Sequence, residues 1–136
     1  MKTKFLILFL GIVVLLSSWK QSQSETSTNS EAGKIKISIM YPNELGKSFD
    51  MDYYAQNHMP MVSELFGEAL LDYGIEKGIS GRTPEEPMSY VAIGYFYFNS
   101  IEEYGKAFGA NAEKILGDIP NYTNIEPTVQ ISEVVR

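Results

Sequence analysis

His58, the single histidine of this 136-residue chain, is the side chain best suited to acid–base chemistry. The ordinary pKa of an imidazole lies near neutrality, so the group can take up and release a proton at physiological pH. Tyr53, Tyr54 and Asn57 lie close to it in the sequence, and a neighbouring hydroxyl or carboxylate could fix its tautomer. A structural histidine is the alternative, bonded to a backbone carbonyl where Pro60 interrupts a helix. The residues leave both interpretations open.

A second set of polar side chains lies in the segment 118–127, which connects a predicted helix to the last predicted strand. Ordered connections of this length are often functional. Asp118 and Asn121 could therefore form hydrogen bonds at the mouth of a pocket. Turn formation is the simpler interpretation, because Asp and Asn beside a proline such as Pro120 favour turns. The run Asn121-Tyr122-Thr123 also matches the glycosylation sequon, a short pattern that carries little weight.

Tyrosines form the third group of candidates, and the chain has nine of them. Tyr41 and Tyr95 fall in predicted strands, where a hydroxyl could reach a polar atom of a ligand in a cavity. Tyrosines in sheets also serve simply as packing residues. We therefore take His58 as the candidate catalytic residue, and as candidate substrate-binding residues Tyr41, Tyr53, Tyr95, Asp118 and Asn121.

The composition excludes several other kinds of site. The chain has 17 acidic and 11 basic residues and a net charge of -6, which argues against nucleic-acid and anionic membrane partners. The absence of cysteine excludes disulfides, thiolate metal sites, iron–sulfur clusters and a cysteine nucleophile. With one histidine and scattered carboxylates, no metal site is expected. No glycine-rich phosphate-binding motif follows a predicted strand.

The N-terminal 33 residues differ from the rest of the chain. Lys2 and Lys4 precede an apolar run over 5–16, which is typical of a signal peptide and too short for an ordinary membrane-spanning helix. We expect a signal peptide over 1–24, a disordered linker over 25–33 and one folded domain over 34–136. The protein is then exported to the periplasm or the medium. An uncleaved N-terminal anchor is the alternative, and no other membrane partner is expected.

The folded part shows the elements that must position these residues. An alternating apolar pattern predicts a half-buried strand near 35–42, and a strand over 90–98 is apolar on both faces. A helix begins near Asp50, breaks near His58 because a residue before proline disfavours helical geometry, and ends at Gly67 after a second piece. The remaining predictions are a weaker strand over 70–79, a helix from a capping box at Ser100 and Glu103, a short helix over 110–116 and a strand over 128–135.

This order of elements predicts an α+β fold, the ferredoxin-like βαββαβ arrangement with a four-stranded antiparallel sheet. Helices cover one face of such a sheet. Because the strand over 90–98 is apolar on both faces, the second face also needs a cover. We expect a homodimer whose two sheets face one another and close a barrel with an apolar interior.

The domain resembles the EthD family, named for ethyl tert-butyl ether degradation clusters. The similarity covers most of 34–136 in the family's order, with these matching segments: ISIMYPN (37–43), FDMDYY (49–54), HMPMV (58–62), YVAIG (90–94), AFG (107–109) and GDIPNYTNIEP (117–127). The resemblance implies a dimeric α+β barrel. It also maps the family's H-x-P segment onto His58 and its D-I-P-N segment onto 118–121.

Family members are often labelled oxidoreductases, and related barrels include cofactor-free monooxygenases, isomerases, cyclases and dehydratases. Some related barrels bind haem, which makes haem on His58 a minor possibility; otherwise no cofactor is expected. The signal peptide departs from the family, and export would separate the protein from cytoplasmic nicotinamide cofactors. The resemblance thus implies a protein that binds a small, largely apolar molecule, with cofactor-independent acid–base chemistry at His58. A non-catalytic ligand-binding or stress-response homodimer is the alternative.

Overall fold

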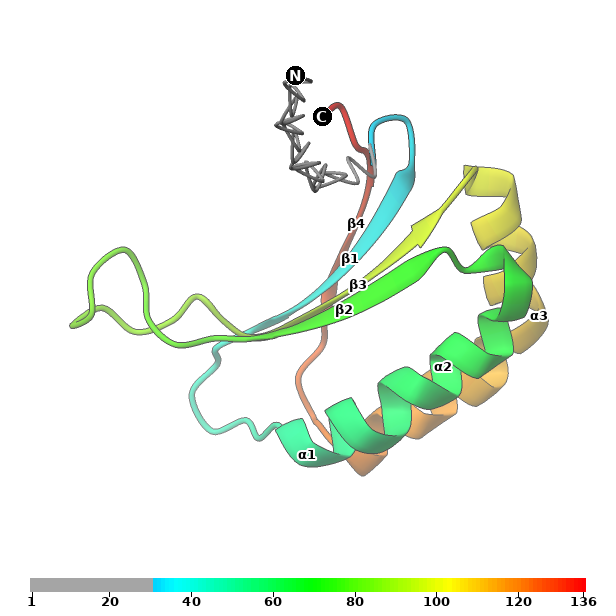
Figure 1. Ribbon diagram of the computed structural model, residues 1–136. Helices are drawn as coiled ribbons and strands as arrows, with labels where there is room; N and C mark the ends of the chain where they lie inside the picture. Colours follow the sequence, from blue (N-terminus) through cyan, green and yellow to red (C-terminus); the bar gives the residue numbers. More distant parts are fainter. Residues whose placement is uncertain (1–30) are drawn as a thin grey trace, which may run out of the picture.

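The computed structural model describes residues 31–136, which form a four-stranded antiparallel sheet with helices on one face (Figure 1). The predicted signal peptide and most of the predicted linker lie outside the described residues. Residues 31–33, the end of that linker, form a turn in which the Gly33 amide donates to the Val134 carbonyl at 2.7 Å. In chain order the elements are β1 (Ile35–Pro42), α1 (Met51–Tyr53), the π-helical turn η1 (Tyr54–His58), α2 (Met59–Phe66), the 3-10 turn η2 (Gly67–Ala69), β2 (Asp72–Lys77), β3 (Tyr90–Phe98), α3 (Ile101–Asp118), the 3-10 turn η3 (Ile119–Asn121) and β4 (Thr128–Glu133).

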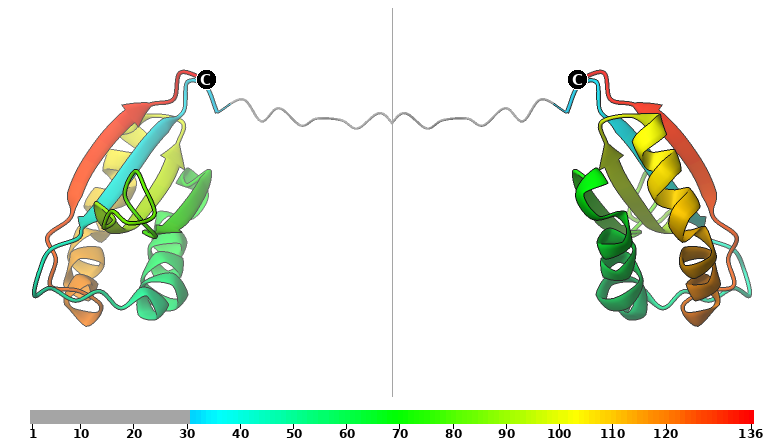
Figure 2. Two further views of the ribbon diagram at one scale, coloured as in Figure 1. Left: turned by 90° about the vertical axis from the view of Figure 1, so that its left-hand side faces the viewer. Right: turned by 90° about the vertical axis from the view of Figure 1, so that its right-hand side faces the viewer.

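The strand order β2-β3-β1-β4 and the βαββαβ connectivity confirm the predicted ferredoxin-like α+β fold. In the β1–β3 register Ile37 is opposite Phe96 and Tyr41 is opposite Ala92, so these four side chains share one face. All four are buried. The core therefore lies between this face of the sheet and the layer formed by α2 and α3, as Figure 2 shows from two sides.

The other face of the sheet differs from the apolar face that we predicted. It carries Ile93, Tyr95 and Tyr97 from β3, but β1 contributes Lys36 and Ser38 beside them. The Lys36 ammonium lies 4.2 Å from the centre of the Tyr95 ring. Alternating positions of one strand thus meet an apolar core on one side and a mixed surface on the other. The strand over 90–98 is apolar on both faces, but the sheet is not.

The helical segment after β1 is continuous, so the predicted break near His58 is wrong. Asp50 caps the first turn, since its carboxylate accepts a hydrogen bond from the Tyr53 amide at 2.9 Å. Met59 has helical backbone angles although Pro60 follows it. The wider π-helical turn absorbs the proline: the Met59 amide donates to the carbonyl of Tyr54, five residues back. The segment ends at Gly67, as predicted, with a positive φ of 56°.

The segment after β3 forms one helix, α3, in place of the two predicted pieces. It contains Gly105 and Gly109, but no proline interrupts it between 101 and 118, and the Asn111 side chain donates to the Ala107 carbonyl one turn back within the helix. Packing of Tyr104, Phe108 and Ile115 against the core compensates for the low helix propensity of the glycines. Only half of the predicted capping box forms: the Glu103 amide donates to the Ser100 hydroxyl, while Glu103 Oε2 is buried without a partner within residues 31–136.

Candidate functional site

His58 and Asp118 form a hydrogen-bonded pair between the two helical segments. His58 is the last residue of η1 and Asp118 the last residue of α3, and the imidazole Nδ1 lies 2.8 Å from Asp118 Oδ2. A carboxylate accepts hydrogen bonds, so Nδ1 carries the proton and Nε2 is left as the basic nitrogen. The carboxylate therefore fixes both the tautomer and the orientation of the ring.

Asp118 is itself held by two further side chains. The Tyr53 hydroxyl donates to Asp118 Oδ1 at 2.9 Å, and the Asn121 side-chain amide donates to the same oxygen at 2.8 Å. Desolvation acts to raise the pKa of Asp118, but the hydrogen bonds from His58, Asn121 and Tyr53 outweigh it and hold the pKa below its ordinary value. The same bond to Asp118 raises the pKa of Tyr53. The Asp118 carboxylate is therefore ionised at neutral pH, and Tyr53 and Asn121 are positioning residues that hold it in place.

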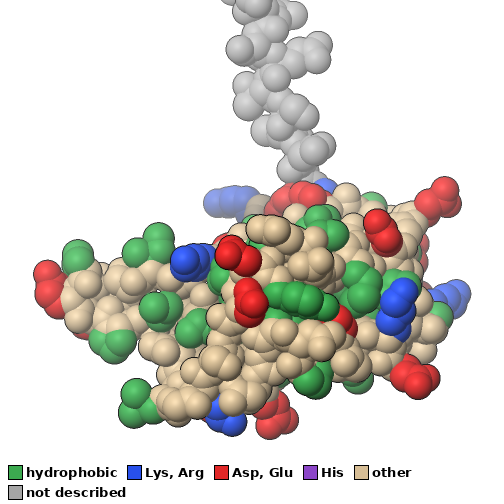
Figure 3. All heavy atoms as spheres, turned by 90° about the horizontal axis from the view of Figure 1, so that it is seen from below, with side chains coloured by type: hydrophobic (Ala, Val, Ile, Leu, Met, Phe, Trp, Pro, Cys, Tyr) green, Lys and Arg blue, Asp and Glu red, His purple; other side chains and the backbone are tan. Residues whose placement is uncertain are grey.

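The imidazole of His58 is buried, with 5% of the residue exposed. No histidine atom is visible on the face of the molecule drawn in Figure 3. Burial lowers the pKa of His58, although the bond to Asp118 acts in the opposite direction. The ring stacks on Tyr54 at 5.7 Å between centroids and lies 4.6 Å from the Tyr122 ring. At neutral pH the group is a neutral base enclosed by aromatic rings.

A cavity of about 110 Å³ lies on the helix side of the sheet, and His58 is part of its wall. Its lining is almost wholly aliphatic and aromatic, which is the usual character of a small-molecule site. The residues around it are Ile37, Ile39, Tyr41, Tyr54, His58, Met59, Val62, Phe66, Phe96, Tyr104, Phe108, Ile115, Leu116, Ile119, Pro127 and Val129.

Two buried tyrosines, Tyr54 and Tyr122, pack against His58, and sequence reasoning assigned neither of them to the site. Tyr122 forms a 2.6 Å hydrogen bond with Tyr41, hydroxyl to hydroxyl. The Tyr54 hydroxyl lies against Gly94, where any Cβ would overlap it. Burial raises the pKa of both Tyr54 and Tyr122 far above the usual value, so both remain protonated. The signal that could have found Tyr54 is its position one helical turn before His58.

Three of the residues that line the cavity carry a polar atom without a hydrogen-bond partner within residues 31–136: His58, Tyr54 and Tyr104. Within residues 31–136, neither His58 Nε2 nor the Tyr54 hydroxyl has a hydrogen-bond partner. Glu103 Oε2 is the one side-chain oxygen or nitrogen of that range that is sealed off without a partner. The polar atoms of the three lining residues therefore reach accessible space. His58 and Tyr54, whose rings stack at 5.7 Å between centroids, provide one acceptor and one donor side by side in an apolar wall.

The structure brings most of the predicted site residues together. His58, Asp118, Tyr53 and Asn121 form one hydrogen-bonded cluster, and Tyr41 lines the cavity beside it. Tyr53 and Asn121 lie on the outer side of Asp118 and do not line the cavity. Tyr95 is on the opposite face of the sheet, because it is an odd step from Phe96 along β3. It lies across Gly74 and under Lys36, away from the site.

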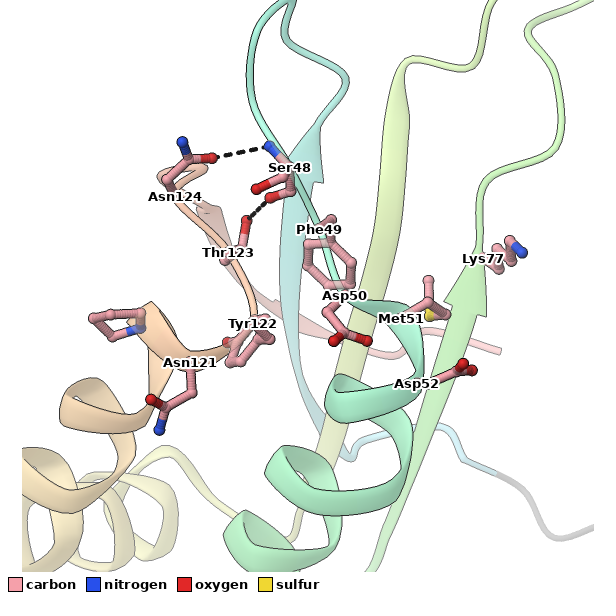
Figure 4. A pocket seen from close by; sticks show the side chains of 11 residues that line it. Ser48, Phe49, Asp50, Met51, Asp52, Lys77, Asn121, Tyr122, Thr123 and Asn124 are labelled. Carbon is pink, nitrogen blue, oxygen red and sulfur yellow. Dashed lines mark hydrogen bonds between the residues drawn. The ribbon is translucent and has the colours of Figure 1, made fainter.

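A shallow polar hollow of about 660 Å³ lies where the segment before α1 meets the segment after η3 (Figure 4). The Thr123 hydroxyl donates to the Ser48 carbonyl at 2.7 Å, and the Ser48 amide donates to the Asn124 side chain at 2.9 Å. These bonds tie the two segments together. They help to fix Tyr122, whose ring contacts His58 at 4.6 Å between centroids. The segment 118–127 can therefore both form turns and contribute side chains to the site, so the two interpretations of its sequence are compatible.

Residues 31–136 hold no group of three or more His, Cys, Asp or Glu side chains that could bind a metal ion. Over the same range, no helix combines the length and the apolar character needed to cross a membrane.

The model of the EthD domain matches residues 43–126. An EthD-like protein from Ralstonia eutropha JMP134 is 44% identical; its crystal structure aligns over 77% of this chain and 95% of that chain, with a TM-score of 0.74. An ethyl tert-butyl ether degradation (EthD) family protein from Bacillus halodurans C-125 is 14% identical, covers 74% of this chain and 98% of that chain, and has a TM-score of 0.53, a likeness in fold alone. None of the proteins with curated descriptions matches. The matched domain spans most of the described residues, and the chain belongs to the EthD domain family.

Proposed function

We propose that the protein binds a small, largely apolar organic molecule in the cavity and that His58 removes a proton from it without a cofactor. One observation carries this proposal: a histidine whose Nδ1 is bonded to a carboxylate at 2.8 Å forms part of the wall of an apolar cavity. A base oriented by a third group is the recurring arrangement of acid–base sites.

The roles of the other side chains follow from their contacts. When His58 Nε2 takes a proton from a C–H or O–H group of the ligand, the new imidazolium lies beside the Asp118 carboxylate, which stabilises it. The ligand becomes an anion, and the protonated Tyr54 hydroxyl is the donor available to it. Removal of a proton in this way is a step in isomerisation and in dehydration. It is also a step in cofactor-free oxygenation when dioxygen is a co-substrate.

The test is hydrogen–deuterium exchange at the α-carbon of a small ketone. Cyclohexanone in heavy water, followed by proton NMR, reports proton removal directly and needs no knowledge of the natural substrate. We expect the wild-type protein to accelerate the exchange and His58→Asn to lose the acceleration, on the order of 100-fold for a positioned base. Glu64→Gln, an exposed change on α2, is the matched control and should exchange at the wild-type rate.

Exchange at the same rate with the wild type and with His58→Asn would refute the role of His58 as a base. If cyclohexanone then still bound, the second candidate function would hold: a non-catalytic ligand-binding homodimer, for example in a stress response. The observation in its favour is that Tyr41 and Tyr122 satisfy each other, which leaves few polar atoms for chemistry.

Haem does not fit this site. His58 Nε2 could ligate iron, but a cavity of about 110 Å³ has no room for a porphyrin beside it. The aliphatic lining also offers no cation for the haem propionates. The proposed chemistry at His58 therefore does not include haem.

We also propose a homodimer whose sheets face one another across the side that carries Lys36. Native mass spectrometry of the mature chain would give a dimer mass. A monomer mass at micromolar concentration would contradict this assembly, while leaving the cavity on the opposite side of the sheet unaffected.

A further inference from the structure

The cavity is closed on most sides and open at one seam. Most of its lining residues are buried or half-buried, but Leu116 is 53% exposed and Val129 is 52% exposed. Leu116 is in the last turn of α3 and Val129 is the second residue of β4. These two elements run along the same side of the molecule in both views of Figure 2. The opening of the cavity therefore lies between α3 and β4.

The apolar surface continues from this opening along β4. Val129 is opposite Ile39, and Ile131 is opposite Ile37, so both point to the helix side of the sheet. Their β1 neighbours are half-buried and buried, whereas Ile131 is 44% exposed. Leu116, Val129 and Ile131 form the apolar strip, a surface of three large aliphatic side chains that joins the interior of the cavity to solvent.

The size of the cavity limits what can be enclosed. An apolar protein cavity of about 150 Å³ is large enough for benzene. The cavity here, about 110 Å³, therefore accepts little more than one small ring or a short alkyl group. Any larger ligand must project through the opening, and it would then lie on the apolar strip. The polar end of such a ligand finds an acceptor and a donor together at the buried residues His58 and Tyr54.

We propose that the ligand is an amphiphile which enters between α3 and β4, with its small polar end at His58 and its hydrocarbon body on Leu116, Val129 and Ile131. This inference rests on the proposed function and names the class of molecule: a carbonyl or hydroxyl compound with a one-sided apolar extension. Leu116 and Val129 determine specificity, since their side chains decide how wide a body can pass.

The composition of the chain makes a direct experiment possible. It has no cysteine and one histidine, so an introduced thiol is labelled uniquely and the imidazole NMR signal is unambiguous. Leu116→Cys is treated with methyl, butyl or octyl methanethiosulfonate, whose alkylthio group joins the protein in a disulfide with release of methanesulfinate. We expect the butyl and octyl chains to enter the opening, shift the Hε1 signal of His58 and lower the pH midpoint of its titration, because they displace water. The methyl label should do neither.

Ile101→Cys is the matched control, because Ile101 is on the same helix, is 56% exposed and does not line the cavity. The same alkyl labels there should leave the His58 signal unchanged. Val129→Cys approaches the opening from β4 and should reproduce the Leu116→Cys result if the helix variant folds poorly.

Equal His58 spectra for the octyl labels at 116, 129 and 101 would overturn the proposal. So would thiols at 116 and 129 that react only after dilution to monomer, since a second copy would then cover the strip. A His58 shift without any ketone exchange in the wild type would confirm the opening and refute the base, so the two proposals can fail separately.

Discussion

Both faces of the sheet carry aromatic side chains, but the two faces have different properties. On the helix side, Tyr41, Tyr54 and Tyr122 are packed among other rings. The hydroxyls of Tyr41 and Tyr122 bond to each other, and that of Tyr54 has no partner within residues 31–136. On the open side, Tyr95 lies across a glycine, under a lysine ammonium. Aromatic content alone therefore does not locate a site. The distinguishing feature is a titratable pair, His58 and Asp118, at the edge of an enclosed apolar space.

A pair of glycine substitutions should give the largest difference in stability between the two faces of the sheet. A methyl group at Gly94 would overlap the Tyr54 hydroxyl, and Tyr54 is pinned by Tyr41, Phe49 and Tyr122. We expect Gly94→Ala to lower the free energy of unfolding by about 1–3 kcal/mol, the usual cost of overpacking. Gly74→Ala meets the Tyr95 ring, which can swing toward solvent, and should cost below about 1 kcal/mol. Urea unfolding of both variants checks this, and equal losses would contradict it.

The buried hydroxyl pair on the helix side should give the next largest effect. Tyr122→Phe removes one partner of the 2.6 Å bond and leaves the Tyr41 hydroxyl without one, at a cost of about 1–3 kcal/mol. Adding Tyr41→Phe should restore part of that loss, because two apolar rings need no partner. A double-mutant cycle in urea measures the coupling. Additive losses would show that the two hydroxyls do not depend on one another.

The His58–Asp118 pair should make stability depend on pH in one direction. Burial lowers the pKa of folded His58 below its unfolded value of 6.5, so below that pH the unfolded chain binds the extra proton first. Stability should therefore fall as the pH decreases from about 7 to about 5. The lowered pKa of Asp118 acts in the same direction, below its unfolded value of 3.8.

Urea unfolding at about pH 7 and about pH 5 would measure this dependence. His58→Gln keeps a polar side chain of similar reach but does not titrate, so its stability should change less over the same interval. A steeper loss in His58→Gln than in the wild type would show that other groups control the acid sensitivity.

Much of the fold could be predicted from local pattern. The alternation in β1 and β3 and the caps at Asp50 and Ser100 depend on neighbouring residues alone, and they were placed correctly. The continuous helix through His58 could not be predicted this way. A π-helical turn is stabilised by the packing of Tyr54 and Met59 in the core, and the local rule for residues before proline does not include that packing.

The candidate site was predicted in part for the same reason. His58 and Asp118 stand out by chemical type, but their contact joins positions 60 residues apart and depends on how α3 packs on α2. Tyr95 was chosen because tyrosine in a strand can face a cavity. Which face holds the cavity depends on the side that the helices cover, and alternation along β3 does not specify that side.

A substitution on the open face of the sheet, the face that carries Lys36 and Tyr95, should have the smallest effect on stability. It also tests whether a second copy of the chain covers this face. Lys36→Met keeps the alkyl stem and removes the ammonium from the Tyr95 ring, so a half-buried cation–π contact of about 0.5–1 kcal/mol is lost. On a monomer this loss should be the same at every protein concentration. If two sheets face one another, Lys36 is desolvated in the assembly, and its removal should change the unfolding midpoint by an amount that depends on concentration. Measuring the unfolding midpoint at two protein concentrations decides whether Tyr95 and Tyr97 of β3 face solvent or a second copy of the sheet.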